Sequence, residues 1–369
     1  MGILLTISQP LGRSELRLLN RLAIAPSMRQ SALARELGVS RSAINQLWTK
    51  LVRDYGLAIR GGIDYGRLGL RFVFGWAQVS GTSDVLTKFS RWLKSNAFVT
   101  RLTTSMMSST LDEMVYFESI IPLDDRYAWF RRQIERFQKR PYNLAISFNE
   151  ALNISHHLNL ALFNGSRWSF SNDFRFLATM DAAKGYVDVL PSVGTVEQSK
   201  NYNFSVDDLV TASAIESDYF VTATRLARIF ETLEFKPNAG RTLRRKISDT
   251  RKRLALPYVD FENLGLPQKL IVCIKTNSEL SPLSRVLHAQ ASTFPKARVI
   301  SGQSLTVLDL DTPKSVDWLT TTQILTNLAG NTSEICTFIA DRNEIEKRLE
   351  SVVSSITSRM PSRENNSRR

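Results

Sequence analysis

The sequence has few of the residues from which common catalytic and metal sites are built. Among 369 residues there are two cysteines and three histidines. Two cysteines exclude a disulfide-rich scaffold and a four-cysteine zinc site. The chain also lacks an HExxH pair, a paired cysteine motif, a phosphate-binding glycine loop and a nucleophile elbow. These absences predict a protein that is not an enzyme, without catalytic residues, a metal site or a cofactor.

Long apolar runs are also missing. Hydrophobic residues make up 43% of the chain, but no run reaches the roughly 18 residues that span a bilayer, so no membrane partner is expected. The first eight residues are too short for a secretory signal, which predicts a cytoplasmic protein. The net charge of +13 favours a nucleic-acid partner, although a basic balance also serves solubility or attraction to anionic lipid.

The stretch from Arg29 to Asp54 has the pattern of a helix-turn-helix. The first helix is expected from Gln30 to Leu37, and Gly38 suits the left-handed residue that ends a helix. Ser40 is a good N-cap for the second helix. The inward positions of that helix recur at spacings of three and four, at Ile44, Leu47 and Leu51.

The outward face of the second helix combines guanidinium, hydroxyl and amide groups, which suit base edges and phosphates in a major groove. An amphipathic helix pair with a polar outer face is also common in proteins that bind no DNA. We assign DNA binding to these residues: Arg41, Ser42, Asn45, Gln46, Thr49, Lys50 and Arg53.

Flanking segments extend this pattern to a winged helix over residues 1–66. Upstream, Ser14 is expected to cap a further helix. Downstream, residues 57–60 and 61–65 are short apolar runs around a Gly-Gly pair, which predicts a hairpin wing that carries Arg60 as another DNA contact.

Residues 67–150 alternate between strand-like and helix-like segments in the order βαββαβ. That order predicts a ferredoxin-like α/β domain. Asp124 is expected to cap the second of its helices. Strands are expected near residues 72–79, 99–106, 113–121 and 143–148.

A winged helix, the hinge from Ile63 to Leu70 and a βαββαβ domain together resemble the Lrp/AsnC (feast/famine) family of transcription regulators. The resemblance implies DNA binding as dimers or higher assemblies, with the α/β domain assembling the oligomer and often binding an amino-acid effector. The family's glycine-containing turn is here Ser108 to Asp112 and lacks the glycine. A small-molecule effector at the α/β domains therefore stays open as a partner.

The second half of the chain repeats the first. Residues 259–266 match the hinge at an offset of 196, which also superposes Leu243 on Leu47. Residues 205–262 therefore predict a second helix-turn-helix, with Ser205 as a cap. Its recognition helix, 239–254, is strongly basic and favours phosphate contact, although a solvated basic face is the plain alternative. The DNA-binding residues assigned here are Asn238, Arg241, Thr242, Arg245 and Lys246.

A second βαββαβ series is expected at residues 263–342, with helices over 283–291 and 315–328. Gly302 keeps the turn glycine that the first copy lost. The remainder, 343–369, predicts a helix to Ser358 and a disordered basic tail. The segment 151–204 has no counterpart in the repeat. Its Asn164-Gly165 pair predicts a hairpin, a helix is expected over 171–184, and the segment is apolar enough to pack on an α/β domain.

The fold class predicted is α+β, with two winged helix-turn-helix domains each followed by a ferredoxin-like domain. We expect the α/β domains to pair within the chain as a pseudo-dimer, with further homodimerisation open. Cys273 and Cys336 should be neighbours in the second sheet as free thiols.

The function predicted is sequence-specific binding of double-stranded DNA in transcription regulation. Two alternatives are weighed beside it. Siroheme decarboxylases resemble tandem Lrp/AsnC proteins, and the pair His156-His157 could contact a tetrapyrrole. A winged-helix scaffold that contacts only proteins is the third interpretation.

Overall fold

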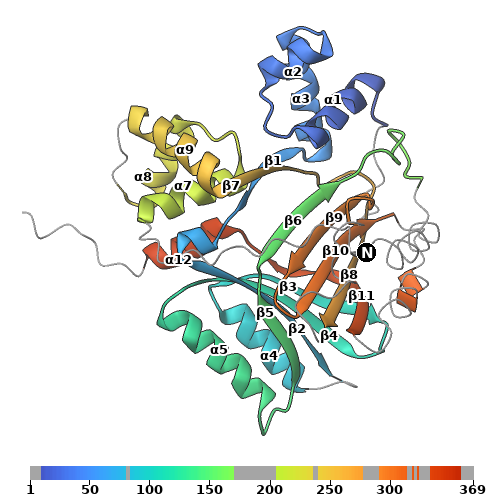
Figure 1. Ribbon diagram of the computed structural model, residues 1–369, viewed down its shortest axis with the longest axis vertical. Coiled ribbons are helices and arrows are strands. Elements are labelled where there is room, and N and C mark those ends of the chain that lie inside the picture. Colours follow the sequence, from blue (N-terminus) through green and yellow to red (C-terminus); the bar gives the residue numbers. More distant parts are fainter. Residues whose placement is uncertain are drawn as a thin grey trace, which may run out of the picture.

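The computed structural model describes residues 10–79, 84–169, 205–235, 240–276, 291–313, 318–319, 322–323 and 333–358. Two three-helix units lie at one end of the molecule, and a large curved sheet with its covering helices lies at the other (Figure 1). A two-stranded ribbon runs between them. Within the described ranges, no helix has the length and apolar character needed to cross a membrane.

The first helical unit contains α1 (Arg13–Ile24), α2 (Gln30–Leu37) and α3 (Arg41–Tyr55). Gly38 ends α2 with φ of 67°, and the Ser40 hydroxyl accepts a hydrogen bond from the Ala43 amide at 3.1 Å. Both caps confirm the sequence prediction. Ser14 is not a cap, because α1 already begins at Arg13. The unit is held by a leucine-rich core that includes Leu18, Leu19, Leu22, Leu33, Ile44 and Leu51.

The second unit contains α7 (Val206–Ser217), α8 (Ala223–Thr232) and α9 (Gly240–Leu254). Ser205 caps α7 in a reciprocal capping box, as the sequence predicted for that residue. The C-terminal helix α12 (Leu349–Thr357) packs against α7, so α7 is buried on nearly every side.

The predicted wing hairpin does not form. The Gly61-Gly62 pair lies inside one strand, β1 (Ala58–Ile63), which pairs antiparallel with β7 (Ala255–Asp260) of the second repeat. The glycines serve close approach instead of a turn, because a Cβ at Gly61 would lie 2.9 Å from the Ile215 carbonyl oxygen in α7. The two helical units therefore share one ribbon.

The first α/β domain has the predicted βαββαβ order. It comprises β2 (Leu70–Val79), α4 (Asp84–Ser95), β3 (Val99–Ser108), β4 (Glu113–Pro122), α5 (Asp125–Gln138) and β5 (Ala145–Glu150). Its strand order is β5-β2-β4-β3, as in ferredoxin-like sheets, and α4 and α5 lie together on one face (Figure 1). Asp124 caps α5 by accepting a hydrogen bond from the Arg126 amide, as predicted.

The second α/β domain comprises β8 (Gln268–Thr276), β9 (Lys296–Ser301), β10 (Leu305–Thr312) and β11 (Ser333–Glu346), in the order β11-β8-β10-β9. The helices predicted over 283–291 and 315–328 fall largely outside the described residues. The helix predicted from residue 343 begins only at Leu349, because β11 continues to Glu346 by pairing with β3 of the first domain.

The two α/β domains join edge to edge in one nine-stranded sheet, which confirms the prediction that they pair within the chain. β3 pairs with β11 in its centre. Cys336 lies directly opposite Cys273 in the pairing of β11 with β8, and both are buried free thiols, as predicted.

The segment after the first domain adds the last strand. β6 (Asn153–Leu158) pairs with β9, which confirms that this segment packs on an α/β domain. Between β5 and β6, the Ala151 amide donates to the Phe72 carbonyl and the Leu152 amide donates to the Ser301 carbonyl, at 2.8 and 2.7 Å. This two-residue step joins opposite edges of the sheet, so the sheet curls towards closure (Figure 1).

The predicted turn at Asn164-Gly165 also forms. Phe163 and Trp168 make an antiparallel bridge around it, and Gly165 has φ of 99°. The turn lies against the first helical unit, because the Leu11 amide donates to the Gly165 carbonyl at 2.8 Å. The helix predicted over 171–184 lies outside the described residues.

Candidate functional site

A cavity of about 950 Å³ lies between the β1–β7 ribbon and the inner face of the curled sheet. Both repeats contribute to its wall, as do β6 and the segment between β11 and α12. Its volume is at the upper end of the roughly 300–1,000 Å³ that is typical of ligand sites. The cavity therefore has room for one large ligand.

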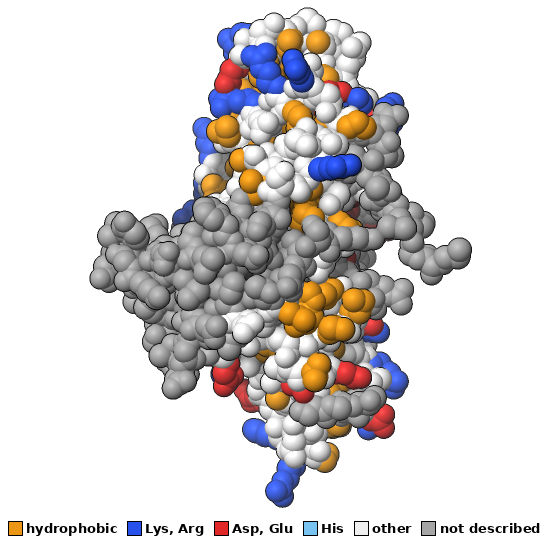
Figure 2. Space-filling view, turned by 90° about the vertical axis from the view of Figure 1, so that its right-hand side faces the viewer, with side chains coloured by type: hydrophobic (Ala, Val, Ile, Leu, Met, Phe, Trp, Pro, Cys, Tyr) orange, Lys and Arg blue, Asp and Glu red, His pale blue; other side chains and the backbone are white. Residues whose placement is uncertain are grey.

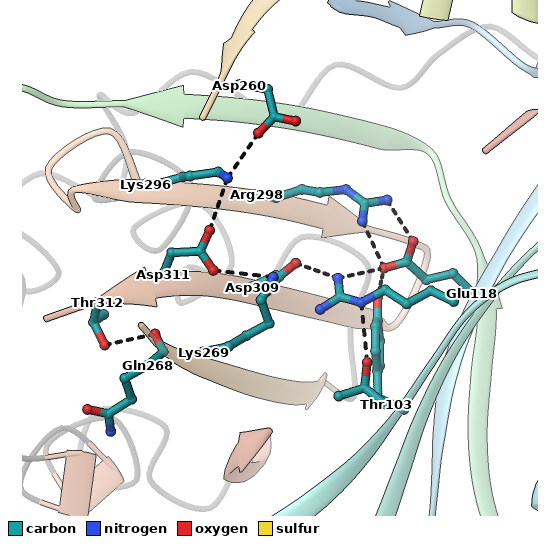
Figure 3. A network of polar contacts seen from close by, with 12 residues as sticks. Thr103, Glu118, Asp260, Gln268, Lys269, Lys296, Arg298, Asp309, Asp311 and Thr312 are labelled. Atoms are coloured by element: carbon teal, nitrogen blue, oxygen red, sulfur yellow. Dashed lines mark hydrogen bonds and ion pairs between the residues drawn. The ribbon is translucent and has the colours of Figure 1, made fainter. Parts of the chain in front are cut away.

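Buried ion pairs form the floor of the cavity (Figure 3). Arg298 of β9 holds both carboxylate oxygens of Glu118 in β4, at 2.8 and 2.9 Å. Arg101 of β3 donates to Glu118 at 3.2 Å and also to Asp309 of β10. Each α/β domain thus supplies one arginine from its second strand and one acid from its third.

The acids of this cluster are held in their charged form. Burial by itself would raise the pKa of Asp309, but the charges of Arg101 and Lys269 hold that pKa well below its ordinary value. Burial would likewise raise the pKa of Glu118, but the charges of Arg298 and Arg101 lower it. These ion pairs hold the four charges of the floor in place.

Alternating charges continue from the floor to the ribbon (Figure 3). Lys269 lies 3.6 Å from Asp309 and 3.2 Å from Asp311, and Lys296 lies 3.2 Å from Asp311 and 2.9 Å from Asp260. Asp260 belongs to β7, and its pKa is lowered because Lys296 and Arg60 outweigh its burial. The ribbon is therefore tied to the sheet through charged side chains.

His156 stands on β6 in the cavity wall. Its ring stacks on Tyr258 of β7, with centroids 3.7 Å apart and planes 6° from parallel. Burial and the nearby charge of Arg298 lower the pKa of His156 to about 3. The ring is therefore neutral at physiological pH, which is the form that binds metals. Burial also lowers the pKa of His157, whose Nε2 lies 3.0 Å from the Ser155 hydroxyl.

A hydroxyl and a carboxyl form a second polar group at the cavity. The Tyr65 hydroxyl donates to Oε1 of Glu216 at 2.6 Å, and the Leu349 amide donates to Oε2 of the same carboxylate at 2.8 Å. Burial raises the pKa of Glu216. This carboxyl therefore keeps a proton more readily than the acids on the floor.

Further cations line the cavity where chain segments meet. Ten Lys and Arg face eight Asp and Glu among its lining residues. Lys252 and Arg253 come from the end of α9, Lys347 and Arg348 precede α12, and Arg67 lies in the short helix η1 (Gly66–Leu68). The lining has a small excess of positive charge and suits an anionic ligand.

The described residues assigned to DNA binding do not line this cavity, and only Arg60 among them pairs with a residue that does, Asp260. Most of the first set form the exposed face of α3: Arg41, Ser42, Asn45, Gln46, Thr49 and Arg53. Lys50 is partly covered by an ion pair with Glu15 at 2.7 Å. Arg60, the expected wing residue, is turned inward and pairs with Asp260 at 2.6 Å, because β1 pairs with β7 instead of forming a hairpin.

The second set is divided in the same way. Arg241, Thr242 and Arg245 are exposed on α9, and Arg245 lies 3.7 Å from Asp249. Lys246 instead faces α7, where it pairs with Asp207 and Asp208 at 3.4 and 3.2 Å. Asn238 lies outside the described residues.

The sequence prediction missed the floor of the cavity. A usable signal was present, because single charged residues interrupt apolar strands at Arg101, Glu118, Arg298 and Asp309. A charge is rarely buried unless it is paired, so such interruptions indicate partners on neighbouring strands. Tyr65 and Glu216 lack a comparable signal, because a hinge tyrosine and a helical glutamate are ordinary.

Comparisons with known proteins give neighbours in fold only. No protein-family model matches the chain, and no curated protein matches it. A crystal structure of the siroheme decarboxylase NirDL covers 93% of this chain and 98% of its own, with 12% identity and a TM-score of 0.47. The same enzyme in complex with an iron-uroporphyrin III analogue covers 93% and 99%, with the same identity and score. A structure of PH0061 covers 39% and 95%, with 16% identity and a TM-score of 0.27.

These neighbours correct one prediction. The chain was expected not to be an enzyme, whereas two structures that align with 93% of it are those of a decarboxylase. The mixed α+β class is confirmed by the large antiparallel sheet of the chain itself.

Proposed function

We propose that the chain is an enzyme that binds an iron tetrapyrrole carrying several carboxylates and removes carboxyl groups from it as CO₂. The observation that carries the proposal is the cavity of about 950 Å³, in which arginines and lysines lie beside a neutral histidine. The reaction class is the one named for the siroheme decarboxylase neighbours.

The lining suits carboxylates. Arginine binds carboxylates in bidentate geometry, and lysine binds them as a point charge. The floor cations are already paired with Glu118, Asp309 and Asp311. We therefore assign the substrate carboxylates to other cations of the lining, namely Lys252, Arg253 and Lys347, together with Arg67 and Arg348, which form ion pairs with Asp64 and Asp260 at 3.2 and 3.9 Å. The ion-paired residues of the floor would then set the shape and the electrostatic field of the cavity.

The wall of the cavity offers a ligand for the iron and a flat surface for the tetrapyrrole ring. A neutral imidazole is a common iron ligand, and His156 is kept neutral by its surroundings. Tyr258 and Phe72 add aromatic surface to the lining, on which a flat macrocycle could stack. His156 is therefore the residue we assign to the iron.

The test is a titration of the purified chain with iron uroporphyrin, followed by mass analysis of the tetrapyrrole after incubation. We expect a shift of the Soret band and products that have lost CO₂. His156→Ala should abolish the shift that reports iron coordination, whereas the exposed Arg245→Ala on α9 should leave it unchanged. A wild-type chain that causes no Soret change and no loss of CO₂ would overturn the proposal.

A second function is favoured by the exposed face of α3, which projects from the end of the molecule opposite the sheet. Lys and Arg side chains gather over this end (Figure 2). We propose that α3 contacts double-stranded DNA through Arg41, Ser42, Asn45, Gln46 and Thr49, with Arg241, Thr242 and Arg245 of α9 adding charge. Both helical units belong to one chain, which would therefore bind as an intrachain pseudo-dimer.

A gel-shift series at low salt tests this second function. Arg41→Ala combined with Asn45→Ala should weaken retardation of DNA, because it removes a phosphate or base contact and an amide that can pair with adenine. Arg13→Ala, on the first turn of α1, is the matched exposed control. Failure of the wild-type chain to retard any DNA at low salt would exclude the function.

A further inference from the structure

The two repeats differ at several positions of the hinge that borders the cavity, and one of these differences removes a hydroxyl. Tyr65 in the first hinge corresponds, at the offset of 196, to Phe261 in the second, which is buried and has no hydroxyl. The partner of Tyr65 differs as well, because α1 begins at Arg13 and α7 at Val206, which makes Ala23 the counterpart of Glu216. The hydrogen bond between Tyr65 and Glu216 therefore has no counterpart at the equivalent positions of the repeat.

Tyr65 and Glu216 form a hydrogen-bonded pair at the cavity. Glu216 is 7% exposed and accepts hydrogen bonds on both oxygens, from the Tyr65 hydroxyl and from the Leu349 amide at the start of α12. The Tyr65 ring stacks on Phe72 with centroids 5.5 Å apart, which fixes its direction. Tyr65, Phe72 and Glu216 all line the cavity.

Tyr116 and Tyr127 also donate hydrogen bonds to glutamates, and neither of these bonds suits proton transfer at the cavity. Tyr116 donates to Glu118, which two arginines keep ionised, and Tyr127 donates to Glu150, which pairs with Arg71. Neither tyrosine lines the cavity. Of these three tyrosines, Tyr65 is the one that lines the cavity.

We propose that Tyr65 is the proton donor of the decarboxylation and that Glu216 reprotonates it. The inference rests on the proposed function. When a carboxylate leaves as CO₂, the carbon–carbon bond breaks and its electron pair stays on the ring substituent. Tyr65 delivers its proton to that carbon, takes the proton of the Glu216 carboxyl, and Glu216 regains one from water. One carboxylate is thereby replaced by one hydrogen, without an oxidant or reductant.

Tyr65→Phe and Glu216→Gln test the proposal in the full chain. Tyr65→Phe reproduces what the second repeat already has at Phe261, so the change fits an aromatic hinge position. The control is Tyr142→Phe, whose ring packs on Phe137 in the first α/β domain, away from the cavity. Binding of iron uroporphyrin is read from the Soret band, and the first loss of CO₂ is timed by mass analysis from pH 5 to 9.

We expect Tyr65→Phe to bind like wild type but to lose CO₂ roughly 10²–10⁴-fold more slowly, as is typical when a general acid is removed. The wild-type rate should fall as pH rises through the pKa of Glu216, and Glu216→Gln should lack that fall. The control should match wild type in both measurements.

The outcomes separate the two proposals. If the wild-type chain neither binds the tetrapyrrole nor releases CO₂, the proposed function and the proton donor both fail. If the wild type is active and Tyr65→Phe stays within about threefold of it, the donor assignment fails while the function stands. If Tyr65→Phe loses binding as well as rate, the hydroxyl binds substrate and is not the donor. Should Tyr65→Phe not fold, the pH profile of Glu216→Gln decides alone.

Discussion

Arg101 of the first repeat and Asp309 of the second form an ion pair across the centre of the sheet, with each side chain 7% exposed. Arg101 also pairs with Glu118 of its own domain. The two domains are therefore joined by charges that water reaches poorly, as well as by the pairing of β3 with β11. Removing one member of such a cluster leaves its partners charged and buried.

Arg101→Met should therefore destabilise the protein by about 3–5 kcal/mol, the range observed when one partner of a buried ion pair is removed. The measurement is the free energy of unfolding in urea. Arg245→Met, at an exposed position on α9, is the matched control and should change that energy by less than about 0.5 kcal/mol. A loss below about 1 kcal/mol for Arg101→Met would show that water or rearrangement compensates the buried carboxylates.

His156 should make stability depend on pH in a defined window. Its pKa is about 3 in the folded chain and about 6.5 when unfolded. Above pH 6.5 it is neutral in both states and contributes nothing. As pH falls below 6.5, only the unfolded chain takes up the proton, so the free energy of unfolding falls by at most about 1.4 kcal/mol per pH unit.

His156→Gln should flatten that dependence between pH 6.5 and 4.5, measured by urea unfolding at a series of pH values. Acids with lowered pKa, such as Glu118 and Asp260, act below this window, because their stabilisation is lost only as pH falls beneath the ordinary carboxyl range. An unchanged slope in the variant would place the titration on another group.

Gly61 and Gly62 offer a matched pair in the ribbon. A Cβ at Gly61 would lie 2.9 Å from backbone of α7, whereas one at Gly62 would lie 3.4 Å from the Leu256 carbonyl oxygen. Gly61→Ala should cost about 1–3 kcal/mol, as overpacking does, and Gly62→Ala should cost much less. The measurement is the melting temperature of each variant by thermal unfolding. Equal melting temperatures would contradict the close approach of β1 to α7.

The proposed DNA contact predicts a division within α9. Arg245→Ala should lower the salt dependence of binding by about one unit of slope for the lost phosphate contact. Lys246→Ala should leave that slope unchanged, because Lys246 is turned to Asp207 and Asp208. Titrations with random duplex DNA at several salt concentrations measure both slopes, and a reduced slope for Lys246→Ala would mean that this lysine leaves its acidic partners on binding.

Local signals in the sequence were sufficient for the helical units and for the order of strands. Ser40, Ser205 and Asp124 cap helices because a side-chain oxygen next to a free amide acts within one turn. Cys273 and Cys336 could be placed together because strand order in a ferredoxin-like domain makes their strands neighbours. In each case the deciding partner lies within the same turn or the same domain.

Features that depend on the other repeat could not be predicted in this way. A Gly-Gly pair between apolar runs is typical of a hairpin, and only the presence of β7 and α7 makes Gly61 part of a continuous strand. The end of β11 was assigned to a helix because its partner, β3, lies more than two hundred residues away. The ion pairs of the cavity floor join strands of both domains, so no single segment contains their pattern.

The exchange of strands between the repeats has a consequence for how the chain folds during synthesis. β6 follows the first α/β domain in sequence but completes the edge of the second, and the end of β11 completes the first by pairing Glu346 with Arg101. Contacts between residues so distant in sequence slow folding, because a long loop must close before they form. The first sheet therefore keeps β3 as an open edge until β11 has left the ribosome.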